Sequence, residues 1–128
     1  MRRLLAAPLV IVAALAMSPT ASAMEHKLSG AEIHDWIDGN TIIGVWAGTS
    51  YRQFFQADGI TVYQVAGVPV EFGRWWVTET EFCALYVNGG QVCYRVARDG
   101  DRLIWQTMSV WRRNFTAEVL TGNQLAPR

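Results

Sequence analysis

Hydrophobic positions change their period along this chain, from about 3.6 residues near its start to 2 residues further on. Ile33, Trp36 and Ile37 share one face of a helix, and Ser29 is placed to cap that helix in front of them. A glycine follows the last apolar position, as is common where a helix ends. The pattern predicts one short helix over residues 30–38.

After the predicted helix, runs of β-branched and aromatic residues alternate with polar ones and are separated by turn signals such as Asp-Gly and Asn-Gly. Eight short strands are predicted, over residues 41–47, 51–56, 60–66, 70–78, 82–87, 91–97, 102–108 and 110–115. Closing such a sheet removes its exposed edges. We therefore expect a mainly β fold: an antiparallel meander forming a small closed or partly open, lipocalin-like barrel, with one short N-terminal α-helix. The tail, residues 121–128, is expected to be loose.

The start of the chain has the three parts of a secretory signal peptide. Arg2 and Arg3 precede an apolar stretch of 14 residues, and Ala21–Ala23 has the small residues that a signal peptidase requires. That stretch is shorter than the roughly 20 residues of a membrane-spanning helix. We interpret residues 1–23 as a signal peptide and residues 24–128 as a single β-barrel-like domain. The expected location is periplasmic or secreted, with no stable membrane anchor after cleavage.

The charge of the chain depends on this processing. The full sequence has 11 basic and 11 acidic side chains and is formally neutral. Removal of the predicted signal peptide leaves 9 basic and 11 acidic side chains, a net charge of about −2. The sequence indicates no basic surface, so nucleic acid is not an expected partner.

The two cysteines flank a hairpin signal. Cys83 and Cys93 lie symmetrically about Asn88 in an Asn-Gly-Gly turn, so they face each other across the hairpin. An oxidising compartment and an even number of cysteines favour a bond between them. Their spacing differs from that of a redox-active Cys-x-x-Cys pair, and two cysteines are too few for a structural zinc site. A structural Cys83–Cys93 disulfide is predicted.

Residues for acid–base or metal chemistry are scarce. The histidines are His26, in a start expected to be flexible, and His34, on the outward face of the predicted helix. Together with Asp35 they match no standard metal-binding spacing. The acidic residues lie mostly at turns, where Asp58 and Asp99 precede glycine. We expect no metal, no cofactor and no enzymatic activity; a carboxylate pair of the glycosidase type is the catalytic alternative.

Large aromatic residues are in excess for a domain of this size. Trp75 and Trp76 are adjacent on a predicted strand, so they point to opposite faces and only one of them faces the core. The other is covered by the helix, by a partner or by a ligand. Arg74 and Arg95 also lie within strands, where they either face solvent or point into a barrel mouth and recognise an anionic group. The candidate residues for contact with a ligand or a partner are Trp75, Trp76, Arg74, Arg95 and Tyr94.

One ordered pattern runs along nearly the whole predicted domain. Its elements are Gly39-Asn40-Thr41, Tyr51, Phe55, Asp58-Gly59, Gly73-x-Trp75, Cys83 and Cys93-Tyr94-x-Val96. The pattern resembles a family of small exported proteobacterial proteins of unknown function, and the resemblance implies an exported fold without implying an activity. A weaker similarity links the chain to alkaline-protease-inhibitor-type barrels, which are exported and contain one disulfide. Residues 24–27 depart from the N-terminal pattern of those inhibitors.

Two non-enzymatic functions follow as hypotheses. The first is a binding module for a small apolar or amphipathic ligand, favoured by the aromatic excess on a barrel-like pattern, and it requires a cavity larger than a few waters. The alternative is a protein–protein interaction module, such as a protease inhibitor or a cell-envelope partner, and it requires an exposed apolar patch. An enzyme is the third and least favoured hypothesis, which perturbed pKa values clustered in one cleft would support.

Overall fold

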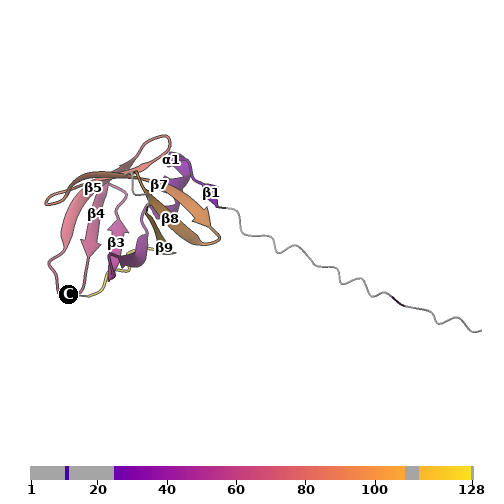
Figure 1. The fold of residues 1–128 in the computed structure, drawn as a ribbon. Helices are drawn as coiled ribbons and strands as arrows, with labels where there is room; N and C mark the ends of the chain where they lie inside the picture. Colours follow the sequence, from indigo (N-terminus) through magenta and orange to yellow (C-terminus); the bar gives the residue numbers. More distant parts are fainter. Residues whose placement is uncertain (1–10, 12–24, 109–112, 128) are drawn as a thin grey trace, which may run out of the picture.

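The computed structural model describes residues 25–108 and 113–127, together with Ile11. The predicted signal peptide, residues 1–23, lies outside the described residues except for Ile11. The described chain forms one helix and nine strands (Figure 1). In chain order they are β1 (His26–Lys27), α1 (Gly30–Ile37), β2 (Thr41–Trp46), β3 (Thr49–Phe55), β4 (Ile60–Gln64), β5 (Glu71–Val77), β6 (Phe82–Tyr86), β7 (Gly90–Asp99), β8 (Arg102–Thr107) and β9 (Asn114–Leu120). No helix in the described part of the chain is long and apolar enough to cross a membrane.

Eight of the strands close into an antiparallel barrel, as predicted. Each strand from β2 to β9 pairs with its neighbours in the chain, and β9 returns to pair with β2. Ile42 of β2 thus lies opposite Val119 of β9, which completes the ring of paired strands. In Figure 1, β3, β4 and β5 form one wall of the barrel, and β7, β8 and β9 form the other. Closure pairs both sides of each strand and so removes the long free edges of an open sheet.

β1 extends the sheet at a place where one strand stops short. β7 is 10 residues long, and its last residues continue past the start of its neighbour β6. β1 occupies the position that β6 leaves, with His26 opposite Arg98. The Leu28 amide then donates to the Val96 carbonyl at 2.9 Å. The expectation of a flexible start is therefore wrong, because the exposed edge of β7 provides hydrogen-bond partners for it.

α1 closes one end of the barrel with its apolar face. Ile33 and Ile37 are fully buried and belong to the same core cluster as Phe55. The predicted cap at Ser29 is present as half of a capping box: the Glu32 amide donates to Ser29 Oγ at 3.2 Å, and the Ser29 amide donates to Glu32 Oε1 at 3.1 Å. The helix therefore begins where the sequence predicts it, and its apolar stripe becomes part of the barrel core.

The last strand differs from its prediction. β9 spans Asn114–Leu120, whereas the predicted strand is 110–115, which lies partly outside the described residues. Ala117 faces the barrel interior opposite Gly44 of β2. An alanine between polar residues gives a weak period-two signal, and its burial depends on closure against a distant strand.

The tail after β9 is held against the outside of the barrel. The Thr41 hydroxyl donates to the Gly122 carbonyl at 2.7 Å and accepts from the Gln124 amide at 2.9 Å. Further along, the Gln64 side chain donates to the Ala126 carbonyl at 3.0 Å and accepts from the Ala126 backbone amide at 2.8 Å. The expectation of a loose tail is wrong, because polar side chains from β2 and β4 bind its backbone.

The predicted disulfide joins Cys83 and Cys93 across the β6–β7 hairpin. The two residues lie directly opposite each other, and their register centres the turn on Asn88, as predicted. Tyr86 and Gly90 form the last pair before the loop. A disulfide of this kind is typical of an oxidising, extracellular-type compartment.

Candidate functional site

The barrel is hollow at the end opposite α1. The buried residues of the helix share one core cluster with residues at the end of β3 and at the starts of β6 and β8, namely Phe55, Phe82 and Leu103. Towards the other end, the interior contains a cavity of about 460 Å³, a volume within the usual range for a small-molecule pocket. Most of its lining is aromatic and includes four tyrosines.

The aromatic rings form two groups that face the cavity. On the β3–β6 side, Tyr51 and Tyr63 stack with ring centroids 5.2 Å apart, and Tyr86 meets Tyr63 edge-on at 6.5 Å. On the side of β2 and β9, the rings of Trp46 and Phe115 lie 3.9 Å apart. Contacts between rings hold each group in place, so the cavity presents flat apolar surfaces of defined orientation.

Two strand glycines make room for these rings. A Cβ at Gly44 would lie 3.0 Å from Tyr51 Oη, and a Cβ at Gly73 would lie 3.0 Å from Tyr86 Cδ1. At Gly73 it would also come within 2.7 Å of the Leu85 carbonyl oxygen. A glycine within a strand often marks a close backbone approach of this kind.

A hydrogen-bonded set of side chains adjoins the aromatic rings. The side-chain Nε2 of Gln53 donates to Thr61 Oγ1 at 2.9 Å and to Tyr86 Oη at 2.8 Å. Thr61 Oγ1 donates in turn to the Phe54 carbonyl at 3.0 Å. Because Tyr86 Oη accepts this bond, its own proton can be donated to a ligand. Trp105 also lines the cavity, and its buried Nε1 has no hydrogen-bond partner in the described part of the chain.

Burial moves the ionisation of the four cavity tyrosines further above neutral pH. Desolvation raises the pKa of Tyr86 to about 12, and it raises the pKa values of Tyr51, Tyr63 and Tyr94 above the ordinary value of 10. The Glu71 carboxylate adds to the rise in the pKa of Tyr63 by Coulombic repulsion. At neutral pH the cavity therefore offers hydroxyl groups and no phenolate.

Among the described residues that line the cavity, Glu71 is the only one with a charged side chain. It lies directly opposite Tyr63 of β4, so both side chains point to the interior. Its Oε1 lies 3.4 Å from the position that a Cβ of Gly89 would occupy. The carboxylate thus extends from β5 to the β6–β7 turn at the rim. Glu71 has no ion pair with any other described residue.

The structure separates the predicted contact residues. Tyr94 faces the interior and lines the cavity. Trp75 also faces inward, but it lies in the core, and its Nε1 donates to a backbone carbonyl at 3.0 Å. Arg74, Trp76 and Arg95 are exposed on the outer face of the barrel. Neither arginine therefore points into the barrel mouth.

Sequence reasoning missed Glu71 and Tyr86 as cavity residues, although a signal for both was present. Once Trp75 is taken as the inward member of its pair, strand parity also places Gly73 and Glu71 inward. Tyr86 is then the cross-strand partner of Gly73 and fills the space that the glycine leaves. The missing information was which tryptophan faces the core.

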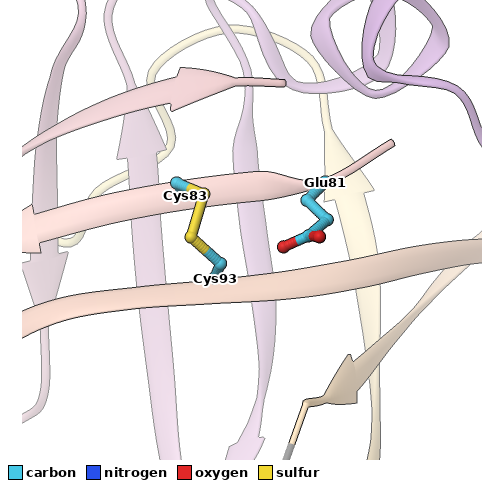
Figure 2. Close-up of side chains that lie close together, drawn as sticks. All are labelled: Glu81, Cys83 and Cys93. Carbon is cyan, nitrogen blue, oxygen red and sulfur yellow. A yellow bond between two sulfur atoms is a disulfide. The ribbon is translucent and has the colours of Figure 1, made fainter. Parts of the chain in front are cut away.

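Figure 2 shows Glu81 beside the Cys83–Cys93 disulfide. One Glu81 carboxylate oxygen and the two sulfur atoms lie within 4.8 Å of one another, the one such group of three potential metal ligands in the described part of the chain. The two sulfur atoms are bonded to each other, so neither is available as a thiolate ligand. The disulfide links the outer face of the barrel, where Cys83 lies directly opposite Trp76.

A larger concavity of about 1170 Å³ lies on the outer surface, between the 66–70 loop and the C-terminal tail. Its lining includes outward side chains such as Ile43, Arg52 and Gln64 together with residues of the loop and the tail. The internal cavity is the stronger candidate site, because its side chains converge from several strands on one volume inside the barrel.

Neither a protein-family model, nor a curated protein, nor a solved structure matches this chain. The resemblance to small exported proteobacterial proteins therefore stays a prediction. Within its pattern, Asn40 connects the end of α1 to the tail. Its side-chain Nδ2 donates to the Trp36 carbonyl at 2.9 Å, and its Oδ1 accepts from the Gly122 backbone amide at 3.0 Å. Tyr51 and Tyr94 of the same pattern line the cavity. The pattern thus includes Asn40, which connects the helix to the tail, and two residues of the candidate site.

Proposed function

We propose that this protein is a small periplasmic or secreted binding module that holds an amphipathic ligand inside its barrel without catalysing a reaction on it. The observation that carries the proposal is the cavity of about 460 Å³, lined mainly by aromatic side chains. A preformed cavity of this kind costs little ordering when a ligand enters it. Tyr86 and the neighbouring phenols supply polar contacts that orient the ligand.

The titration behaviour of the cavity favours binding over catalysis. Its tyrosines are the described residues with clearly raised pKa values, and they cluster in one cleft. Clustering by itself would support an enzyme, so the direction of the shifts is what favours binding. Each shift is upward from 10, so the phenols move away from the range in which a side chain acts as a general acid or base at neutral pH. No histidine lines the cavity in the described part of the chain.

Native mass spectrometry of the protein purified from its own cells tests the proposal. We expect a bound small molecule that is absent from Val92→Phe, because Val92 lines the cavity and a larger side chain there obstructs part of the space that the ligand occupies. Leu85→Phe is the matched control, since Leu85 faces outward on the same hairpin and is 46% exposed. A protein that carries no small molecule, and whose tryptophan fluorescence does not respond to apolar probes, would contradict the proposal.

A specific observation also favours the second candidate, a protein–protein interaction module. Phe72 and Leu85 are 49% and 46% exposed and lie on the outer face of β5 and β6 with Trp76, and Val87, which is 79% exposed, follows β6 in the turn. Arg74 lies directly opposite Leu85 on this face. Exposed apolar side chains that adjoin one another are typical of contact surfaces.

Crosslinking in the intact cell envelope separates the two candidates. An interaction module should lose a specific crosslinked partner in Leu85→Asp and keep it in Val92→Phe. A ligand-binding module should lose its small molecule in Val92→Phe and keep it in Leu85→Asp.

A further inference from the structure

One negative charge lies at the rim of an otherwise uncharged aromatic cavity. Within the described part of the chain, no lysine, arginine or histidine lines the cavity together with Glu71. The Glu71 carboxylate also lacks an ion-pair partner among those residues. A carboxylate in a half-buried position gains most from a positive charge placed beside it.

Aromatic rings border the same rim. Tyr63 lies opposite Glu71 on the neighbouring strand, and Tyr86 meets Tyr63 edge-on. From the other side of the cavity, Trp46 meets Tyr94 edge-on, with ring centroids 6.3 Å apart. The electron-rich faces of tryptophan and tyrosine attract cations, most strongly when the cation is poorly hydrated.

We propose that the cavity selects an amphipathic organic cation. Its apolar body enters the aromatic interior, and its substituted ammonium group lies at the rim between Glu71 and the rings of Tyr63 and Tyr86. This inference rests on the proposed ligand-binding function and specifies the class of ligand.

The same residues disfavour the other charge types. An anionic ligand would be repelled by Glu71, and the arginines that could neutralise it, Arg74 and Arg95, are exposed on the outer face. A calcium or magnesium ion requires about six or more oxygen ligands. One carboxylate among aromatic rings does not provide them, whereas it suits an alkylated ammonium group.

A pair of ligands of nearly equal shape tests the selection. Phenyltrimethylammonium and tert-butylbenzene differ by the charge on the central atom of the trimethyl group, and benzoate serves as the anionic comparison. Each is titrated into the purified protein, with tryptophan fluorescence, to which Trp46 and Trp105 at the cavity contribute, as the signal and calorimetry as a second measurement. We expect the cation to bind at least about 10-fold more tightly than the neutral compound, and benzoate to bind most weakly.

Two charge-neutralising variants identify the residue responsible. Glu71→Gln should remove most of the cation's advantage while changing the affinity for tert-butylbenzene by less than about twofold. Glu79→Gln is the matched control, because Glu79 is exposed in the β5–β6 turn at the end closed by α1. It removes the same charge from the protein and should leave all three affinities unchanged.

The outcomes separate this inference from the proposed function. Equal binding of the cation and the neutral compound overturns the cation preference and leaves the binding cavity supported. Tighter binding of benzoate overturns it as well, and so does a cation preference that persists in Glu71→Gln. If none of the three compounds binds, the organic-cation inference fails, while the co-purified ligand in native mass spectrometry still decides the proposed function.

Discussion

Close backbone approach determines the residue type at several positions of this barrel. Gly30 is the clearest case, because a Cβ there would lie 1.6 Å from the Thr78 carbonyl oxygen. Its amide donates to the Glu79 carbonyl at 2.8 Å, which joins α1 to the β5–β6 turn. The glycine therefore allows the helix to seat on the barrel end.

Gly30→Ala should move the helix away from the barrel end and destabilise the fold. We expect a loss of roughly 2 kcal/mol or more in the free energy of unfolding, because backbone on both sides of the contact has to shift. Urea unfolding followed by tryptophan fluorescence measures the change.

The control is Gly89→Ala. A Cβ at Gly89 would meet its nearest atoms at 3.4 and 3.5 Å, an ordinary contact distance. This variant should stay within about 0.5 kcal/mol of the wild type. Equal losses in the two variants would show that the contact of Gly30 with the turn is not the cause.

Glu71 and Tyr63 interact through charge at the cavity rim. The carboxylate raises the pKa of Tyr63 in addition to the effect of burial, whereas burial alone raises the pKa of Tyr94. Glu71→Gln should therefore lower the pKa of Tyr63 and leave that of Tyr94 unchanged. NMR titration of tyrosine ring carbons measures both values in one sample. A pKa of Tyr63 that stays the same would show that the carboxylate does not face this ring.

Among the elements, the β6–β7 hairpin is closed covalently as well as by hydrogen bonds. Its disulfide lies on the outer face, whereas Tyr86 and Val92 of the same strands face the cavity. Stability and ligand binding should therefore respond separately to changes at the cysteines, because the two faces of a strand contact different surroundings.

The double variant Cys83→Ala/Cys93→Ala tests this separation. The disulfide closes a short loop in the unfolded chain, so its loss should cost on the order of 2–3 kcal/mol. Urea unfolding measures the loss, and the affinity for phenyltrimethylammonium should stay within about twofold at low denaturant. A large fall in affinity with unchanged stability would contradict the assignment of the disulfide to the outer face.

At the scale of the whole molecule, alkaline pH acts through the buried tyrosines. Folding raises the pKa of Tyr86 from 10 to about 12, so its effect on stability does not change below about pH 10. Between about pH 10 and 12 the unfolded chain loses this proton first, and the free energy of unfolding falls.

The full effect of Tyr86 corresponds to roughly 3 kcal/mol, and the other three cavity tyrosines act in the same direction. Urea midpoints measured across this range, together with the absorbance of tyrosinate, should show unfolding and ionisation occurring together. Tyr86→Phe should show a smaller alkaline loss. Midpoints that do not change with pH would mean that the phenols are open to solvent.

Some features were predictable because the residues that make them are close in the chain. The capping box joins Ser29 and Glu32, three positions apart, and the helical face repeats within two turns. The Cys83–Cys93 bond follows from the symmetry of its hairpin about Asn88. Local hydrogen bonds and short-range periodicity determine such elements before any distant segment takes part.

Other features depend on segments that are distant in the chain. β1 pairs with β7 some 70 residues later, and Thr41 binds the tail across 81 residues. The last strand and the tail were predicted wrongly for this reason, since their partners are chosen when the barrel closes. The local sequence pattern does not indicate which polar side chain will form a hydrogen bond with which distant backbone group.

The sequence by itself determined a small β-barrel with one helix and a disulfide-linked hairpin, because those features result from short-range pattern. Only the tertiary structure decided the candidate site. Strand parity leaves two choices for every strand, and closure of the barrel selected the face that carries Trp75, Gly73 and Glu71 as the interior. The cavity exists because side chains from strands that are not neighbours in sequence meet around one volume that α1 closes at a single end.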